Sequence, residues 1–179
     1  MATVADVIDL LAQELARTSA ELLPLVCLFA ALAWFGVYGA ILFIIDVREH
    51  RLPNVLTASL AIGASLLLLT SSWTATSDSF LAGRALPAIL GALAYCAAMF
   101  LLHVVTRAGI GMGDVKLAAG LGLYTGFLGV DALIAGFVLA FVIGGAQAVY
   151  LVVFRGASKS TRIAFGPAML VGCLVVLLM

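Results

Sequence analysis

The sequence predicts an all-α polytopic membrane protein with six transmembrane helices, and three observations support this fold class. Hydrophobic residues make up 65% of the 179 residues and charged residues only 10%, whereas roughly 25% of residues are charged in typical soluble domains. The mean hydropathy is +1.26. The apolar residues also fall into long runs separated by short polar loops. A chain of this length can hold one membrane domain but no additional large soluble domain.

Six apolar runs can be marked along the chain, and each is an expected helix. A spanning helix needs roughly 20 apolar residues. The first, third and fifth runs satisfy this length, while the second and fourth are short and are expected to include flanking residues. The runs cover, in order, about 22–45, 55–69, 85–105, 117–130, 132–154 and 163–179.

The residues before the first run do not have the pattern of a cleavable signal peptide. A signal peptide begins with basic residues followed by an apolar core, but this segment carries Asp6, Asp9 and Glu14. We expect residues 1–21 to form a short amphipathic helix at the membrane surface. Residues 22–179 would then form the transmembrane domain.

The charges of the loops predict how the chain is oriented in the membrane. Cytoplasmic loops of membrane proteins carry an excess of Lys and Arg. The loops after the first, third and fifth runs hold most of the basic residues, namely Arg48, Arg51, Arg107, Lys116, Arg155, Lys159 and Arg162. The opposite side has only Arg17 and Arg84, together with most of the acidic residues. This distribution places the three basic loops in the cytoplasm and both termini outside it.

Two acidic residues lie where an apolar run meets a basic loop. Asp46 ends the first run, and Asp114 precedes the fourth. A carboxylate at membrane depth is costly, so a functional role is the first hypothesis. Two carboxyl groups about 3 Å apart share one proton, so that one can activate water while the other donates to a carbonyl oxygen. The pair therefore indicates an intramembrane aspartyl protease, which requires no metal ion or other cofactor.

The glycines before Asp114 fit this interpretation. Gly109, Gly111 and Gly113 have no Cβ, so a substrate backbone could approach closely, and the segment is expected to be irregular. Irregular backbone at membrane depth is tolerated where it lines a wet cavity. The alternative is that Asp114 caps the fourth helix at its N-terminus.

Three sequence blocks, together with the six-run layout, resemble the type IV prepilin peptidases, which are GxGD-type aspartyl proteases. The likeness is greatest to the small members that serve Flp/Tad pili. The first block runs from Asp46 to Asn54 and reads DVREHRLPN; the second, from Gly111 to Lys116, matches GxGDxK; the third is Phe165-Gly166-Pro167.

The resemblance implies that Asp46 and Asp114 are the catalytic pair of a multi-pass protein of the bacterial cytoplasmic membrane. The reaction would remove the short basic leader of a prepilin at the cytoplasmic face. The expected partners are prepilins, through the leader and the first hydrophobic helix, and membrane lipid, with no nucleic acid.

The chain departs from larger family members in two ways. Those members carry a domain with paired CxxC cysteines and also N-methylate the new amino terminus. Here Cys27, Cys96 and Cys173 all lie within apolar runs, where buried packing is expected, and no S-adenosylmethionine site is visible. The family often has Pro before Phe-Gly-Pro, whereas this chain has Ala164.

Other residues near the aspartates are candidates for binding substrate or shaping the site. This set comprises Gly111, Gly113, Lys116, Arg48, Arg51, Pro53 and Asn54. For the three basic residues, membrane topology and contact with lipid headgroups is the favoured interpretation. On a regular helix Lys116 would point away from Asp114. We expect Pro53 to stiffen the loop and Asn54 to cap the second helix, while His103 is expected to be a hydrogen-bonded packing residue.

Three other functions remain possible from the residues alone. Paired membrane carboxylates also occur in proton- or ion-coupled transporters, although those usually show repeats and a site near the midplane. A non-enzymatic subunit of a pilus or secretion assembly machine is a second possibility. A presenilin-type protease is a third, but that class has a Tyr-Asp motif, and here Ile45 precedes Asp46. The oligomeric state and the cleavage-site preference are not predicted.

Overall fold

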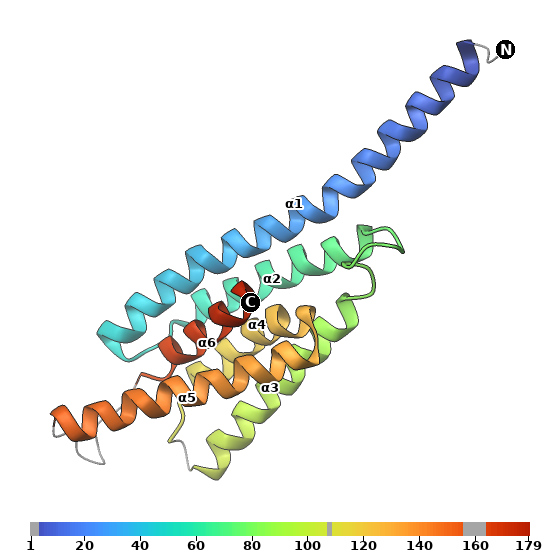
Figure 1. Ribbon diagram of the computed structural model, residues 1–179. Helices are drawn as coiled ribbons and strands as arrows, with labels where there is room; N and C mark the ends of the chain where they lie inside the picture. The colour runs from blue at the N-terminus through green and yellow to red at the C-terminus, as the bar shows by residue number, and fades with distance from the viewer. Residues whose placement is uncertain (1–3, 107–108, 156–163) are drawn as a thin grey trace.

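The fold is an all-helical bundle, as the composition predicts (Figure 1). The computed structural model describes the backbone of residues 4–106, 109–155 and 164–179, and the side chains of residues 22–106, 109–154 and 164–179. Within these ranges there are six helices and no strand. The helices are α1 (Val4–Glu49), α2 (Asn54–Thr74), α3 (Ala85–Val105), α4 (Met112–Leu128), α5 (Val130–Arg155) and α6 (Gly166–Leu178).

Four of the described helices are long and apolar enough to cross a membrane. These are α2, α3, α5 and the part of α1 that starts at Leu22. The second run, short in the sequence, becomes a helix of 21 residues because it includes flanking polar residues up to Thr74. The other two helices are shorter, with 17 residues in α4 and 13 in α6.

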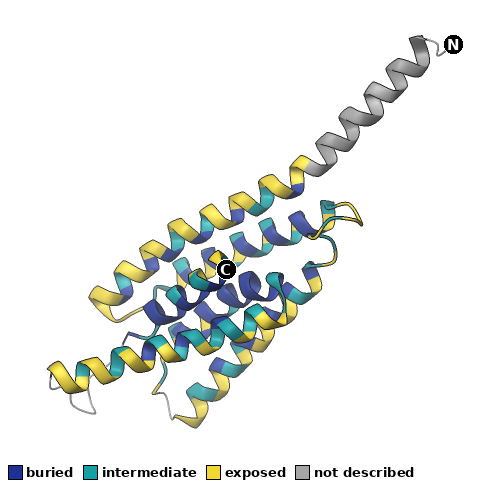
Figure 2. Ribbon diagram, viewed as in Figure 1, coloured by how far each residue is buried: buried dark blue, intermediate teal, exposed yellow. Residues whose placement is uncertain are grey.

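Helix α4 is short because it is the central helix of the bundle. It contacts α2, α3, α5 and α6, and Figure 2 shows that most of its residues are buried. A helix enclosed by protein does not have to match the thickness of the lipid around it. The hydropathy of the sequence identifies this helix but does not distinguish burial in protein from contact with lipid.

Glycines allow α3 and α4 to cross with their backbones in contact. A Cβ added at Gly91 would lie 2.6 Å from the carbonyl oxygen of Gly122 and from Cα of Gly126. A Cβ at Gly122 would lie 2.5 Å from the carbonyl oxygen of Gly91. The small-xxx-small spacing of Gly122 and Gly126 is thus a packing motif, as this spacing predicts.

The N-terminal segment continues the first transmembrane helix. Helix α1 runs without a break from Val4 and has 46 residues, with Pro24 inside it. The backbone of residues 4–21 is therefore an extension of the first span. The predicted amphipathic, interfacial role of residues 1–21 concerns side chains outside the described residues and stays a prediction.

The three cysteines differ in their burial. Cys173 is buried, as predicted, but Cys27 and Cys96 are only partly buried. The prediction that all three are buried is therefore wrong for two of them. Both lie on helices that cover the outside of the bundle, where a partly exposed apolar thiol is compatible with a lipid surface.

The antiparallel arrangement places the ends of three helices beside the starts of the other three. Helices α1, α3 and α5 end at the lower left of Figure 1, where α2, α4 and α6 begin. The two remaining connections lie at the opposite end, where Nη1 of Arg84 donates a hydrogen bond to the carbonyl oxygen of Leu128 at 3.0 Å. Asp46 and Asp114 thus belong to the same end of the bundle, and the cytoplasmic orientation of this end remains a prediction.

Candidate active site

Asp46 lies in the last full turn of α1 and is almost completely buried, with 4% of its surface exposed. Gly166, the first residue of α6, packs against it. A Cβ added at Gly166 would lie 2.5 Å from Oδ2 of Asp46. The backbone N–H of Gly166 is directed at the Asp46 carboxyl group. The free amides and the dipole at a helix N-terminus favour a negative charge at this position.

One oxygen of Asp46 is left without a partner. Oδ2 is buried and accepts no hydrogen bond from any described residue. Leaving a buried polar atom unpaired costs free energy, so such an atom in a folded protein requires an explanation. A site that binds water and substrate supplies one.

Asp114 lies in the first turn of α4 and is 8% exposed. Gly111 is the N-cap of this helix, and the backbone N–H of Asp114 donates to the Gly111 carbonyl oxygen at 3.1 Å. The Asp114 carboxyl group in turn accepts a hydrogen bond from the backbone N–H of Gly111. This contact resembles the return half of a capping box. The alternative that Asp114 is itself the N-cap residue is therefore wrong, because it is the third residue of the helix.

The two aspartates are brought to the same place by the loop between α1 and α2. Leu52 in this loop packs between the starts of α4 and α6. A Cβ added at Gly113 would lie 3.0 Å from Cβ of Leu52, and one added at Gly166 would lie 3.3 Å from its Cδ1. The carboxyl groups of Asp46 and Asp114 are close enough for the charge of the first to act on the second. Two buried acids from separate helices therefore lie near each other, beside Leu52.

The glycine segment is irregular over a shorter stretch than predicted. Residues 109–111 are non-helical, but α4 begins at Met112, so that Gly113 is helical. The prediction of irregular backbone up to Gly113 is therefore wrong at its end. Amides in the first turn of a helix need no intrahelical partner, and the missing Cβ of Gly113 leaves room for Leu52.

Lys116 and Asn54 are joined by a hydrogen bond. Nζ of Lys116 donates to Oδ1 of Asn54 at 2.8 Å. The prediction that Asn54 caps α2 is wrong, because the N-cap is Pro53, without a side-chain hydrogen bond, and the Asn54 side chain is used by Lys116 instead. Since α4 is regular from Met112, Lys116 lies about 200° around the helix from Asp114. It points away from that residue, as expected for a regular helix, and links α4 to α2.

The remaining predicted site residues are not brought to the carboxyl groups. Arg48 and Arg51 are exposed at the end of α1 and in the loop after it. Neither guanidinium group forms a hydrogen bond to another residue within the part of the chain that the structure describes. Pro53 is the N-cap of α2 and has an extended backbone, with φ of −62° and ψ of 128°.

Two residues near the pair were not singled out by the sequence analysis. His50 ends α1 in the left-handed region, with φ of 53°, and its N–H donates to the Asp46 carbonyl oxygen at 2.9 Å. A left-handed residue of this kind commonly terminates a helix. Leu52 was also missed, although an apolar residue between Arg51 and Pro53 in a short polar loop is a signal for a buried contact.

The Phe-Gly-Pro block is anchored by its aromatic ring. Phe165 packs on Phe141 of α5 with ring centroids 5.1 Å apart. A Cβ added at Gly144 would lie 2.5 Å from the Phe165 ring. This contact holds the start of α6, and with it Gly166, beside Asp46.

The fold and the site together define a class of multi-pass helical membrane protein with two buried acids from separate helices at one end. Residues 33–149 match the type IV leader peptidase family, and that range includes both aspartates. The chain belongs to this family, as its sequence blocks indicate.

Two curated relatives have the same degree of similarity. The chain is 30% identical over 154 residues to the prepilin leader peptidase/N-methyltransferase of Aeromonas hydrophila. The matched residues cover 83% of this chain and 49% of the relative. The protein of the same name from Aeromonas salmonicida strain A449 is also 30% identical, with 48% of its length covered. The chain thus spans about half the length of these relatives. No solved structure matches it significantly.

Proposed function

We propose that this protein is an aspartyl endopeptidase that removes the basic leader of Flp/Tad-like type IV prepilins at the cytoplasmic face of the bacterial inner membrane. Asp46 and Asp114 are its catalytic residues, and residues 22–179 form its peptidase domain. The observation that carries the proposal is the buried pair of carboxyl groups from α1 and α4. Membership of a peptidase family supports the reaction type.

The proposed reaction uses one ionised and one protonated carboxyl group. The ionised group takes a proton from water, whose oxygen attacks the peptide carbonyl carbon while the protonated group donates to the carbonyl oxygen. The C–N bond then breaks as one acid gives a proton to the leaving amine and the other takes up a hydroxyl proton of the tetrahedral intermediate, so that the pair again shares one proton. Asp46 lies at the N-terminus of α6 with Oδ2 unpartnered among described residues. We assign to this oxygen the contact with water.

The surrounding residues position the pair. Gly113 and Gly166 leave room for Leu52 between the starts of two helices. The hydrogen bond between Lys116 and Asn54 fixes α4 relative to the start of α2.

The orientation of the site is proposed from the loop charges. Arg48 and Arg51, together with Lys116, lie at the end of the bundle that carries the aspartates, and such an excess of basic residues favours the cytoplasmic side. The two relatives are named as N-methyltransferases as well as peptidases. The proposal for this chain covers the peptidase reaction alone.

Processing of a co-expressed prepilin tests the proposal. Asp46→Asn and Asp114→Asn should each reduce leader removal by at least about 100-fold, since positioned acid–base groups contribute typically 10²–10⁴. Asp131→Asn is the matched control, because Asp131 is an exposed carboxylate in the first turn of α5 at the opposite end. Full processing by either site variant, at wild-type abundance in the membrane, would refute the assignment. A transporter would instead lose proton-coupled uptake in both variants.

A further inference from the structure

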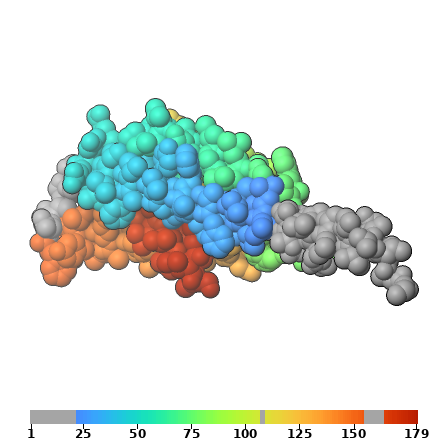
Figure 3. Space-filling view, turned by 90° about the horizontal axis from the view of Figure 1, so that it is seen from above, coloured from blue at the N-terminus to red at the C-terminus, as the bar shows by residue number. Residues whose placement is uncertain are grey.

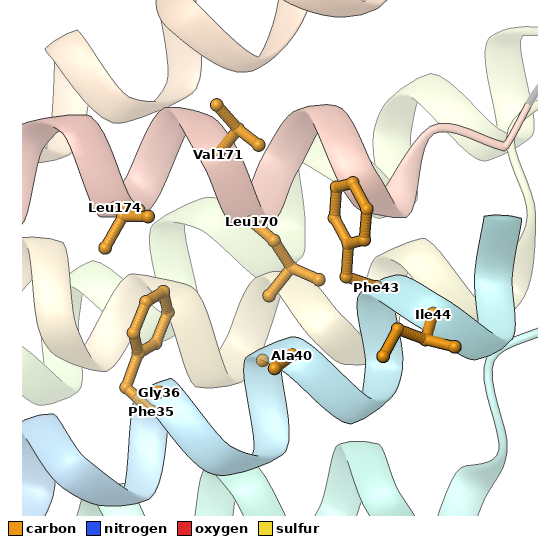
Figure 4. A pocket seen from close by; sticks show the side chains of 9 residues that line it. Phe35, Gly36, Ala40, Phe43, Ile44, Leu170, Val171 and Leu174 are labelled. Carbon is orange, nitrogen blue, oxygen red and sulfur yellow. The ribbon is translucent and has the colours of Figure 1, made fainter.

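A groove in the membrane-spanning part of the bundle lies between α1 and α6. Its volume is about 420 Å³ (Figure 4). The α6 side consists of Leu170, Val171 and Leu174, and the α1 side runs from Phe35 to Ile44. Figure 3 shows the two helices next to each other at the surface of the molecule, with α1 in blue to cyan and α6 in red. The groove is therefore accessible from the side of the bundle.

Both walls of the groove lead to the same carboxyl group. Phe43, a lining residue of α1, precedes Asp46 by three positions and therefore lies on the same face of that helix. On the other wall, Leu170 follows Gly166 by about one helical turn, and Gly166 is the residue packed against Asp46. The groove thus lies within about one helical turn of Asp46 along α1 and of Gly166 along α6.

The α1 side of the groove allows another helix to approach closely. A Cβ added at Gly36 would meet nothing within 4 Å, and one added at Gly39 would meet only side chains, the nearest being Leu170 at 3.6 Å. Gly36 and Ala40 are four residues apart and lie on one face of α1. Small residues at this spacing let the backbones of two membrane helices come into contact. From Phe35 to Ile44 the groove is about 13–14 Å long, which corresponds to roughly nine helical residues.

A protease with this geometry has two requirements for its substrate. The bond to be cleaved must reach Asp46 and Asp114, while the adjoining apolar segment has to keep its backbone hydrogen bonds satisfied within the membrane. A single segment in lipid can satisfy its own backbone hydrogen bonds only as a helix. A groove about nine helical residues long that lies within one turn of Asp46 meets both requirements.

We propose that the groove between α1 and α6 binds the apolar helical segment of the substrate that adjoins the cleaved bond. This inference rests on the proposed function and adds the place where the substrate docks. The groove holds the segment beside Gly36 and Ala40 and directs its end to Asp46. A lipid acyl chain is the other possible occupant, and the experiment separates the two.

Filling the groove should weaken binding of a substrate that has the apolar segment. Gly36→Leu places a bulky side chain on the α1 side of the groove, and the change retains the helix because Leu is a good helix former. Gly145→Leu is the matched control, since Gly145 also has nothing within 4 Å of an added Cβ and lies exposed on α5. Both variants are measured in proteoliposomes with a full-length prepilin and with a short peptide that contains only the cleavage site.

For Gly36→Leu we expect KM for the full-length prepilin to rise on the order of tenfold more than KM for the short peptide. Gly145→Leu should leave the ratio of the two KM values unchanged. An unchanged ratio for Gly36→Leu would overturn the proposal.

A photo-crosslinking amino acid at position 40 provides a readout that does not depend on catalysis. In an Asp114→Asn background it should form an adduct with the apolar segment of the prepilin. Adducts with lipid alone would overturn the docking proposal. If the proposed function fails, wild-type protein cleaves neither substrate, and this result differs from a docking failure, in which cleavage persists and only the crosslink is lost.

Discussion

His103 Nδ1 lies 2.7 Å from the carbonyl oxygen of Ile110, and the N–H of the same peptide group belongs to Gly111, which donates to Asp114. The ring nitrogen must carry a proton here, because a carbonyl oxygen only accepts. One peptide group is therefore held at its oxygen by α3 and at its nitrogen by the carboxyl group of α4. The hydrogen-bonded role that the sequence predicts for His103 is confirmed, and the structure relates it to Asp114.

Removing the hydrogen-bond donor of His103 should lower kcat while leaving KM nearly unchanged. We expect His103→Leu to reduce kcat by about fivefold, because a hydrogen bond contributes roughly 1 kcal/mol, with little change in KM. His103→Asn is the control, since its amide nitrogen can occupy the position of Nδ1 and should retain most of the activity. Equal activity of the Leu and Asn variants in a steady-state cleavage assay would contradict a positioning role.

The hydrogen bond between Lys116 and Asn54 should make the effects of the two single substitutions on the free energy of unfolding non-additive. Both side chains are exposed, so we expect about 0.5–1 kcal/mol between them. The measurement is a double-mutant cycle with Lys116→Met, Asn54→Ala and the double variant, followed by the free energy of unfolding in detergent. Strict additivity of the two single changes would show that the bond contributes nothing to stability.

The sequence predicts those parts of the molecule that depend on composition and local pattern. Long apolar runs give the helices, and the breaks in these runs identify Asp46 and Asp114. The burial of α4 could not be predicted, because lipid-facing and protein-facing helices have similar hydropathy. Its glycines gave the only indication, since Gly122 and Gly126 are spaced for close packing.

Contacts between distant residues account for what the sequence analysis missed. Asn54 precedes an apolar run and has the residue type of an N-cap, but Lys116, which is 62 positions away, uses its side chain. The contact of Gly166 with Asp46 likewise depends on how α6 returns to α1. Neither relationship has a local signal in the sequence.

The crossing of α3 and α4 should not tolerate a side chain. Gly122→Ala adds a Cβ that would lie 2.5 Å from the Gly91 carbonyl oxygen and 2.7 Å from Cα of Ala92. Since backbone atoms cannot move aside easily, we expect a loss of about 1–3 kcal/mol in the free energy of unfolding. Gly145→Ala is the control and should be neutral or slightly stabilising, because its added Cβ meets nothing within 4 Å. Thermal unfolding in detergent distinguishes the two variants, and equal stability would contradict this account of the crossing.

Gly166→Ala should impair catalysis through the position of Asp46. The added Cβ would lie 2.5 Å from Oδ2 and 3.3 Å from Cγ of Asp46, so the carboxyl group has to turn away from the start of α6. A displacement of about 1 Å in a catalytic group can cost roughly 10²-fold in rate, and we expect a loss of this order in kcat. Stability should change far less than in Gly122→Ala, because the clash involves the end of one side chain rather than backbone. The leader-removal assay and thermal unfolding are run on both variants. Wild-type turnover by Gly166→Ala would mean that the contact between Gly166 and Asp46 does not set the position of the carboxyl group during the reaction.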